Sequence, residues 1–160
     1  MTPATLPKRG RFKRHVKGNR MIDFSSDFGV IAARRLSQEG IVWLTTVRGD
    51  RTPQPSPVWF LWDGEIFLIY SQPDTQKLRN IARSAKVALH LNSDQWGNDV
   101  VIVTGDARID EAAPLVREMP AFVKKYVDDL HSAKSLEDFD RIMDGYTVAI
   151  RVTPTGLRGF

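Results

Sequence analysis

Residues 41–80 read IVWLTTVRGDRTPQPSPVWFLWDGEIFLIYSQPDTQKLRN, and this stretch decides the fold. Its apolar and β-branched residues fall into three short runs that are typical of strands. Asp63-Gly64 separates the second run from the third and predicts a tight hairpin, because both central residues of such a turn favour positive φ. A looser turn is expected over residues 49–52. We therefore expect an antiparallel meander of three strands, with strand positions at Val42, Leu44, Val47, Val58, Phe60, Trp62, Ile66, Leu68 and Tyr70.

The middle strand carries a proline at every second residue, at Pro53, Pro55 and Pro57. Proline has no N–H group and cannot donate to a sheet ladder. Because alternate residues of an antiparallel strand point their N–H groups to opposite sides, one side of this strand lacks donors. Two structures fit this pattern: an edge strand that the prolines protect from aggregation, or a slot in which a ligand lies against the strand. The spacing alone favours the edge strand.

A helix is expected from Gln76 to Ser84, with Thr75 or Asp74 as its cap. Lys77 and Arg79 fall in or near its first turn, where the helix dipole favours anions over cations. A phosphate bound at the start of this helix would resolve that conflict. The alternative is that both are solvated surface residues. The inner face is expected to carry Leu78, Ile81 and Ala82.

The chain has 160 residues with 42% hydrophobic and 26% charged content, which is typical of one globular domain. No apolar run is long enough to cross a bilayer, and the basic N-terminus lacks the apolar region of a secretory signal. The absence of cysteine excludes disulfides and thiolate chemistry and is compatible with the cytoplasm, where we expect this protein.

Positive charge is concentrated at the N-terminus. Residues 1–20 hold seven of the 23 lysines and arginines and no acid, so the remaining residues hold 16 against 19 acids. We expect residues 1–27 to form a basic, flexible leader and residues 28–160 to form the folded domain. Binding of nucleic acid through the leader is the alternative, although no aromatic residues interleave the charges to read bases.

The rest of the chain alternates between helices and strands. The expected elements are a helix at Phe28–Glu39, a strand at Lys86–Asn92, a loop at Ser93–Asn98, a strand at Val100–Ile109 with a bulge at Gly105, a helix from Glu111 to about Leu130 split at Pro120, a helix at Leu136–Met143, a strand at Tyr146–Val152 and a tail to Phe160. Six strands with short connections predict a mainly β fold, a six-stranded antiparallel barrel with helices outside. Parallel winding is not expected, because the first turns are too short for crossovers.

Side-chain catalysis has no candidate set in this sequence. His15, His90 and His131 show no metal-ligand spacing, and His90 is expected to be a half-buried strand residue. Nucleophile-elbow, P-loop and dinucleotide-binding motifs are missing. We therefore assign no catalytic and no metal-binding residue, and an enzyme of this sequence would need a bound cofactor to carry the reaction.

Three segments resemble a known superfamily. They are TTVRGDRTPQPSPVWF from Thr45, DGEIFLIYS from Asp63 and KLRNIARSAKVAL from Lys77. Together they resemble the split β-barrel flavin and deazaflavin oxidoreductases, which include pyridoxamine 5′-phosphate oxidase, over roughly residues 28–160. The PVWF segment and the loop around Trp96 look most like the branch that uses the deazaflavin coenzyme F420.

The resemblance implies cofactor contacts from four segments and a homodimer with shared sites. The implied positions are Gln54, Ser56, Pro57 and Val58 against the cofactor ring, Ser71 and Gln72 at its border, Lys77 and Asn80 at the phosphate, and Gln95, Trp96 and Gly97 in a loop that reaches the site across the dimer interface.

The resemblance also implies hydride transfer between coenzyme F420 and a small organic substrate. FMN-using relatives usually carry arginines where this chain has Tyr70-Ser71-Gln72-Pro73, which favours F420 over FMN. An FMN-binding oxidoreductase of the same fold and a non-enzymatic cofactor-binding protein are the alternatives. Vitamin B6 oxidation is not expected, because the arginine and histidine constellation of the oxidase is not evident in Arg151–Phe160.

Overall fold

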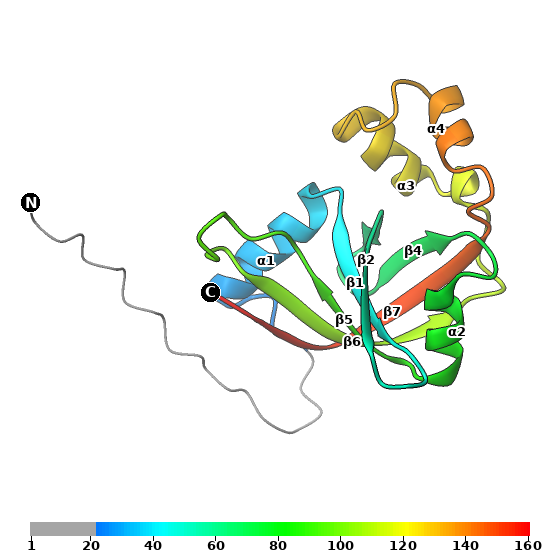
Figure 1. The fold of residues 1–160 in the computed structure, drawn as a ribbon. Helices are drawn as coiled ribbons and strands as arrows, with labels where there is room; N and C mark the ends of the chain where they lie inside the picture. The colour runs from blue at the N-terminus through cyan, green and yellow to red at the C-terminus, as the bar shows by residue number, and fades with distance from the viewer. Residues whose placement is uncertain (1–21) are drawn as a thin grey trace, which may run out of the picture.

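One antiparallel sheet of seven strands forms the body of the computed structural model, which describes residues 22–160. The strands follow the order β2-β1-β5-β6-β7-β4-β3, and the sheet is curled (Figure 1). Their bounds are β1 Val42–Val47, β2 Pro53–Val58, β3 Leu61–Trp62, β4 Phe67–Ser71, β5 Lys86–His90, β6 Val101–Ile109 and β7 Val148–Gly159.

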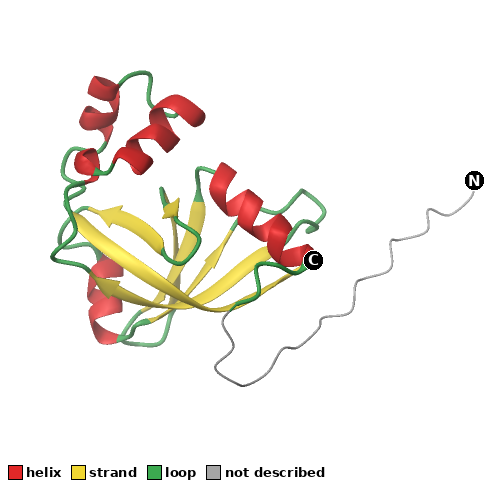
Figure 2. Ribbon diagram, turned by 180° about the vertical axis from the view of Figure 1, so that it is seen from behind, coloured by secondary structure: helices red, strands yellow, loops and turns green. Residues whose placement is uncertain are grey.

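Two helices flank the sheet and the others form a separate unit. α1 spans Asp27–Gln38 and is capped by Ser26, whose Oγ accepts from the Gly29 N–H at 3.1 Å. α2 spans Gln76–Arg83 and lies at the other side of the sheet (Figure 2). The helical unit stands above the sheet and comprises η1 Val116–Glu118, α3 Pro120–Lys124, the π-helix η2 Lys125–Asp129 and α4 Leu136–Ile142.

The apolar residues form two clusters. The first lies between the sheet and helices α1 and α2 and includes Leu36, Leu44 and Ile150. The second joins β4 to the helical unit through Tyr70, Phe122 and buried neighbours. Full burial of a large apolar side chain stabilises the fold by about 1.5–3 kcal/mol, so the second cluster anchors the helical unit firmly.

The split β-barrel fold is confirmed, but with seven strands in the described residues instead of six. The predicted middle strand is two strands, β2 and β3, which lie at opposite edges of the sheet. The prediction of a meander was therefore wrong at Trp59-Phe60, where the chain crosses from one edge to the other. The backbone of Phe60 bonds to the side chains of Lys125 and Tyr126 instead of a neighbouring strand, which explains the break.

The prolines of β2 mark an edge strand, as their spacing favours. β2 pairs with β1, with Gln54 opposite Thr46 and Ser56 opposite Leu44, and within the described residues it has no second partner strand. The three prolines are exposed, whereas the residues between them are half-buried. The outer side of β2 thus lacks backbone donors at alternate positions.

The hairpin at Asp63-Gly64 is confirmed, with β3 paired to β4. Only Gly64 of this pair has positive φ, at 100°. The Asp63 carboxylate supplies the rest of the turn by accepting from the N–H groups of Glu65 and Ile66, both at 2.8 Å. A side-chain acceptor thus takes the place of the second left-handed residue.

Several predicted helices are confirmed, with one exception. Thr75 occupies the N-cap position of α2, although its side chain makes no capping hydrogen bond, and α1 and α4 match their predicted ranges to within one residue. The prediction of a long helix from Glu111 was wrong at its start, because residues 111–115 are not helical and Pro120 begins α3. Ala82 is exposed, so the prediction that it lies on the inner face of α2 was wrong.

The strands around Gly105 extend further than the pattern predicted. The register shifts between Thr104 and Gly105, which confirms the bulge. β7 continues to Gly159 where a tail was expected, with Gly159 opposite Val101 on β6. The segment 153–156 lacks apolar alternation, and its strand conformation comes from pairing with the long strand β6.

Residues 22–160 contain neither a candidate membrane span nor a candidate metal site. None of the helices there is long and apolar enough to cross a membrane. The same residues contain no group of three or more histidine, aspartate or glutamate side chains that could hold a metal. The expected leader lies outside the described residues over positions 1–21.

Candidate functional site

Asn80 joins α2 to the hairpin of β1 and β2. Its side chain is 0% exposed, and its Nδ2 donates to Thr46 Oγ1 at 2.9 Å and to Gln54 Oε1 at 3.2 Å. Its Oδ1 accepts from Gln76 Nε2 at 2.8 Å. Both amide hydrogens of Asn80 are engaged, so the phosphate contact implied for this residue would require it to give up one of these bonds.

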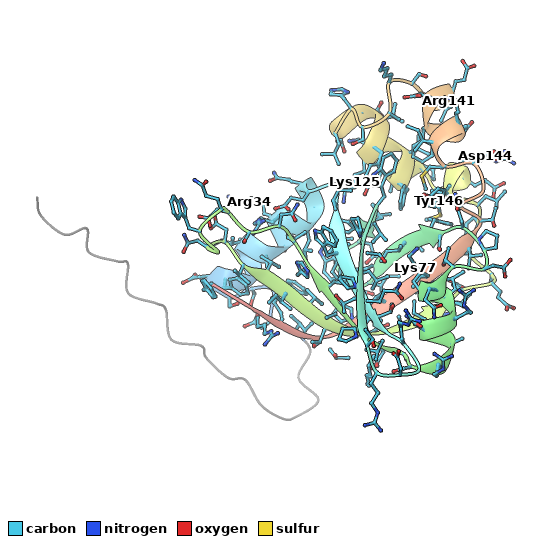
Figure 3. All side chains as sticks on the ribbon, in the orientation of Figure 1. Arg34, Lys77, Lys125, Arg141, Asp144 and Tyr146 are labelled. Atoms are coloured by element: carbon cyan, nitrogen blue, oxygen red, sulfur yellow. The ribbon has the colours of Figure 1, made fainter. Side chains whose placement is uncertain are left out.

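Lys77 lies three residues before Asn80 on the same helix. Its side chain is half-buried, and this burial lowers the pKa of the amine below its usual range. Within the described part of the chain, no carboxylate pairs with it and no group accepts a hydrogen bond from it. Lys77 extends from the start of α2 beside the strands (Figure 3), so a partly desolvated cation without a counter-charge lies at this end of the helix.

The start of α2 is open to an anion. Thr75 is the N-cap, but its side chain makes no capping hydrogen bond, and the first turn holds no acid. Thr75 Oγ1 lies 3.0 Å from Ser71 Oγ, which connects the end of β4 to the helix. Ser71 is buried and Gln72 beside it is exposed. The first N–H groups of α2 therefore lack a side-chain acceptor.

Arg79 does not point to the start of the helix as a second free cation. Its guanidinium donates to the carbonyl oxygen of Asp74 at 2.6 Å and to Gln76 Oε1 at 3.0 Å. Asp74 has a positive φ of 59°, so Arg79 binds the strained residue that leads into α2. The expected pair of converging cations is reduced to Lys77.

β2 presents polar side chains next to this helix. Gln54 and Ser56 are half-buried, Pro57 is exposed, and Val58 packs against the barrel core. Gln54 is the member of the predicted set that contacts α2, through Asn80. The structure thus brings together Gln54, Lys77 and Asn80, with Ser71 and Gln72 at the point where β4 leads into α2.

The loop with Gln95, Trp96 and Gly97 lies away from α2 in the same chain. Asp94 organises it by accepting from the N–H groups of Trp96 at 2.9 Å and Asn98 at 2.7 Å. The loop runs next to α1, on the other side of the sheet from α2 (Figure 1). Trp96 is 79% exposed, so its side chain has almost no contact within its own chain.

A shallow cavity of about 360 Å³ opens near the same loop. The ring of Trp43 stacks on His90 with centroids 6.2 Å apart, and Trp43 Nε1 donates to Asn92 Oδ1 at 2.9 Å. His90 is half-buried, as predicted. The cavity is lined by His90, Leu91, Asn92, Ser93, Val100 and Ile102.

Sequence reasoning missed the polar cluster around Lys125. Lys125 is 5% exposed and donates from Nζ to the Phe60 carbonyl at 2.9 Å, with Nζ 3.7 Å from the centre of the Phe60 ring. Burial lowers the pKa of Lys125 to about 8. The available signal was a lysine at position 125, within a run of the sequence that is otherwise rich in apolar residues.

Solved structures of other proteins share the fold. An F420 reductase is 28% identical, with a TM-score of 0.58 and coverage of 78% of this chain and 94% of that chain. A conserved hypothetical protein from Mycobacterium tuberculosis is 20% identical, with a TM-score of 0.58 and coverage of 79% of both chains. The heme storage protein HutZ from Vibrio cholerae is 18% identical, with a TM-score of 0.54 and coverage of 79% and 90%. The last two show the fold alone.

Sequence comparison places the chain in a family. No curated protein matches the sequence. Residues 31–159, which include the whole sheet and the candidate site, match the family described as pyridoxamine 5′-phosphate oxidase. Because this match covers most of the sequence, the chain belongs to the pyridoxamine 5′-phosphate oxidase family, whose split β-barrel fold is of the flavin-binding oxidoreductase type.

Proposed function

We propose that this protein is an oxidoreductase that binds coenzyme F420 and transfers hydride between it and a small organic substrate. The observation that carries the proposal is Lys77, a half-buried cation with no counter-charge among residues 22–160, at the open start of α2. A bound phosphate there would supply the negative charge that both the Lys77 ammonium and the start of the helix lack.

The phosphate would be held by groups of two kinds. The Lys77 ammonium donates charge-assisted hydrogen bonds, which are roughly twice as strong as neutral ones. The first N–H groups of α2 point along the helix axis toward the same region, and the helix dipole favours negative charge there. Gln72 is exposed beside this helix start and is available as a further polar contact.

The cofactor ring would lie along the outer side of β2. The prolines leave this edge without regular backbone pairing, so a flat ligand meets no competing strand. Gln54 and Ser56 supply polar contacts, and Pro57 and Val58 supply apolar ones. A deazaflavin provides hydride chemistry when bound, and the protein binds and orients it and limits water around the reacting atoms.

Two observations favour coenzyme F420 over FMN. The F420 reductase is 28% identical over 78% of this chain. The segment from Tyr70 to Pro73 has no arginine for an FMN phosphate. FMN binding at the same site is the alternative cofactor.

The proposed site is shared between two copies of the chain. Trp96 is an exposed aromatic side chain on a loop that Asp94 holds in place, and aromatic residues are enriched at protein interfaces. In a homodimer, the loop of residues 95–97 would reach the cofactor bound to the partner. The cavity beside His90 would then lie at or near the interface.

Absorption spectroscopy tests the proposal. The purified protein is titrated with coenzyme F420 and, separately, with FMN. We expect tight binding of F420 and weak or no binding of FMN, and then oxidation of reduced F420 in the presence of an electrophilic substrate. Tight binding of FMN alone would select the alternative cofactor. Binding of F420 without turnover on any substrate would instead indicate a carrier protein.

A further inference from the structure

Four side chains form a hydrogen-bonded chain from the surface of α2 to the edge strand β2. Arg79 Nη2 donates to Gln76 Oε1 at 3.0 Å, and Gln76 Nε2 donates to Asn80 Oδ1 at 2.8 Å. Asn80 Nδ2 then donates to Gln54 Oε1 at 3.2 Å and to Thr46 Oγ1 at 2.9 Å. The chain of bonds therefore connects the candidate phosphate end of the site to its β2 side.

The direction of every bond in this chain follows from its first member. A guanidinium can only donate, so Gln76 must turn its oxygen to Arg79 and its NH2 group to Asn80. Asn80 must then accept from Gln76 and donate to Gln54. An isolated amide could be turned either way, but here each amide is oriented by the one before it.

The last amide in this series of hydrogen bonds is that of Gln54, and its NH2 group has no protein partner among residues 22–160. Because Gln54 Oε1 faces Asn80, the Nε2 of Gln54 points away from the helix. Among residues 22–160, no protein group accepts a hydrogen bond from this nitrogen, and Gln54 is only half-buried. A ligand beside β2 would therefore meet two hydrogens of an amide rather than its oxygen.

We propose that Arg79, Gln76 and Asn80 are positioning residues that hold the Gln54 amide with its NH2 group toward the ligand site. Gln54 is then a fixed donor that selects a ligand with an acceptor at this point, such as a carbonyl oxygen or an unprotonated ring nitrogen. The identity of the ligand rests on the proposed function, and the orientation of Gln54 does not. Arg79 suits this role because its second bond, to the Asp74 carbonyl, fixes the guanidinium in place.

A competing role for Arg79 is direct contact with an anionic ligand, and a double-mutant cycle separates the two. The affinities for coenzyme F420 and FMN are measured for the wild type, Arg79→Met, Gln54→Leu and the double variant. Loss of one neutral hydrogen bond predicts about three- to tenfold weaker binding for Gln54→Leu, and a smaller loss for Arg79→Met. We expect the double variant to bind no more weakly than Gln54→Leu alone.

Two results of the cycle would contradict the proposal that Arg79 orients the Gln54 amide through Gln76 and Asn80. Fully additive losses would mean that Arg79 acts without Gln54. An equal loss in Arg83→Met, which removes the same charge from the same helix without touching Gln76, would mean that only the net charge matters. Retained affinity in Arg83→Met together with a non-additive double variant supports the proposal.

Solvent exchange of the side-chain amides tests the orientation without any cofactor. In the wild-type protein, NMR should show slow exchange of the Asn80 amide hydrogens and fast exchange of those of Gln54. In Arg79→Met, the difference should shrink, because the amides are free to turn. Slow exchange of the Gln54 amide in the wild type would refute the proposed orientation of Gln54. If neither cofactor binds the wild type, the proposed function fails, while the exchange pattern still decides the orientation of Gln54.

Discussion

The ammonium of Lys125 donates a hydrogen bond to the carbonyl oxygen of Phe60 at 2.9 Å, over 65 residues of sequence. This bond connects the helical unit to the point where the chain crosses between the two edges of the sheet. Tyr126 contributes at the same point, since its hydroxyl accepts from the Phe60 N–H at 2.7 Å and lies 2.8 Å from the Gly40 oxygen. Figure 3 shows Lys125 where the helical unit approaches the sheet.

The two residues divide the available acceptors between them. The hydroxyl of Tyr126 has one hydrogen and faces two carbonyl oxygens, those of Gly40 and Phe60. Because Lys125 supplies the Phe60 oxygen, Tyr126 is free to donate to Gly40. Lys125 is thus buried here because it satisfies the Phe60 carbonyl at the strand break. Desolvation of its ammonium opposes this burial.

The stability of the protein should rise with pH above about 8 because of Lys125. Burial holds its folded-state pKa at about 8, below the usual lysine pKa of 10.5, and the charge of Glu39 opposes this lowering. Between these values the unfolded chain binds the proton and the folded one does not, so raising the pH favours folding. From pH 8 to 9.5 the gain should approach about 2 kcal/mol.

Urea unfolding across this pH range, with Lys125→Met as the matched variant, measures the effect. The variant should lack most of the increase, and any part that remains reports other groups such as Lys77, whose pKa is also lowered. The range ends at pH 9.5 because burial raises the pKa values of Tyr70 and Tyr126, which reduces stability once tyrosines of the unfolded chain ionise. Equal pH dependence in both proteins would show that Lys125 does not titrate as described.

Tyr126→Phe should destabilise the fold by about 3 kcal/mol, because it leaves the buried Phe60 N–H and the Gly40 oxygen without this partner. The stacking of Trp59 on the ring, with centroids 4.1 Å apart, would be kept. Tyr146→Phe is the control. Tyr146 is half-buried and its hydroxyl makes no hydrogen bond within the described residues, so its loss should cost less than about 0.5 kcal/mol. Similar losses in both variants, measured by urea unfolding, would contradict the role given to Tyr126.

Replacing Trp96 should affect cofactor binding and dimerisation but not the stability of the single chain. At 79% exposure its side chain has few intramolecular contacts to lose, so Trp96→Ala should change monomer stability by less than about 0.5 kcal/mol. Sedimentation velocity should show weaker dimerisation, and the cofactor titration should show weaker binding. Leu136→Ala, which removes another exposed apolar side chain, should change neither. A monomeric wild type with full cofactor affinity would refute the shared site.

Local signals in the sequence were enough to predict much of the fold. The hairpin at Asp63-Gly64, the start of α2 after Thr75 and the bulge at Gly105 each depend on a few neighbouring residues, and all three positions are confirmed. The break at Trp59-Phe60 depends on Lys125 and Tyr126, which are distant in sequence. No periodicity within the strand signals it, because apolar residues continue through the break.

The candidate site could be predicted in part for the same reason. The alternating prolines and the lysine at the helix start are local patterns, and they led to β2 and α2. The engagement of Asn80 with Thr46 and Gln54 is a tertiary contact, so the sequence did not distinguish a ligand contact from a positioning role. Likewise Arg79 had the pattern of a free cation, while its bonds to Asp74 and Gln76 appear only in the folded chain.

The most direct test of the proposed cofactor site is the dissociation constant of coenzyme F420 for Lys77→Met. The substitution keeps the apolar stem and removes the charge, and losing a charge-assisted bond to phosphate should weaken binding about tenfold to hundredfold. The apo protein should be as stable as the wild type or slightly more so, because a partly buried cation is removed.

Lys134→Met is the matched control, because it removes the same charge from an exposed position on the helical unit and should leave the affinity for coenzyme F420 unchanged. The measurement is a fluorescence titration of the wild type and both variants with coenzyme F420 under identical salt conditions. We predict a large loss of affinity in Lys77→Met alone. Equal affinities in all three proteins would contradict the phosphate role of Lys77 and the cofactor site built on it.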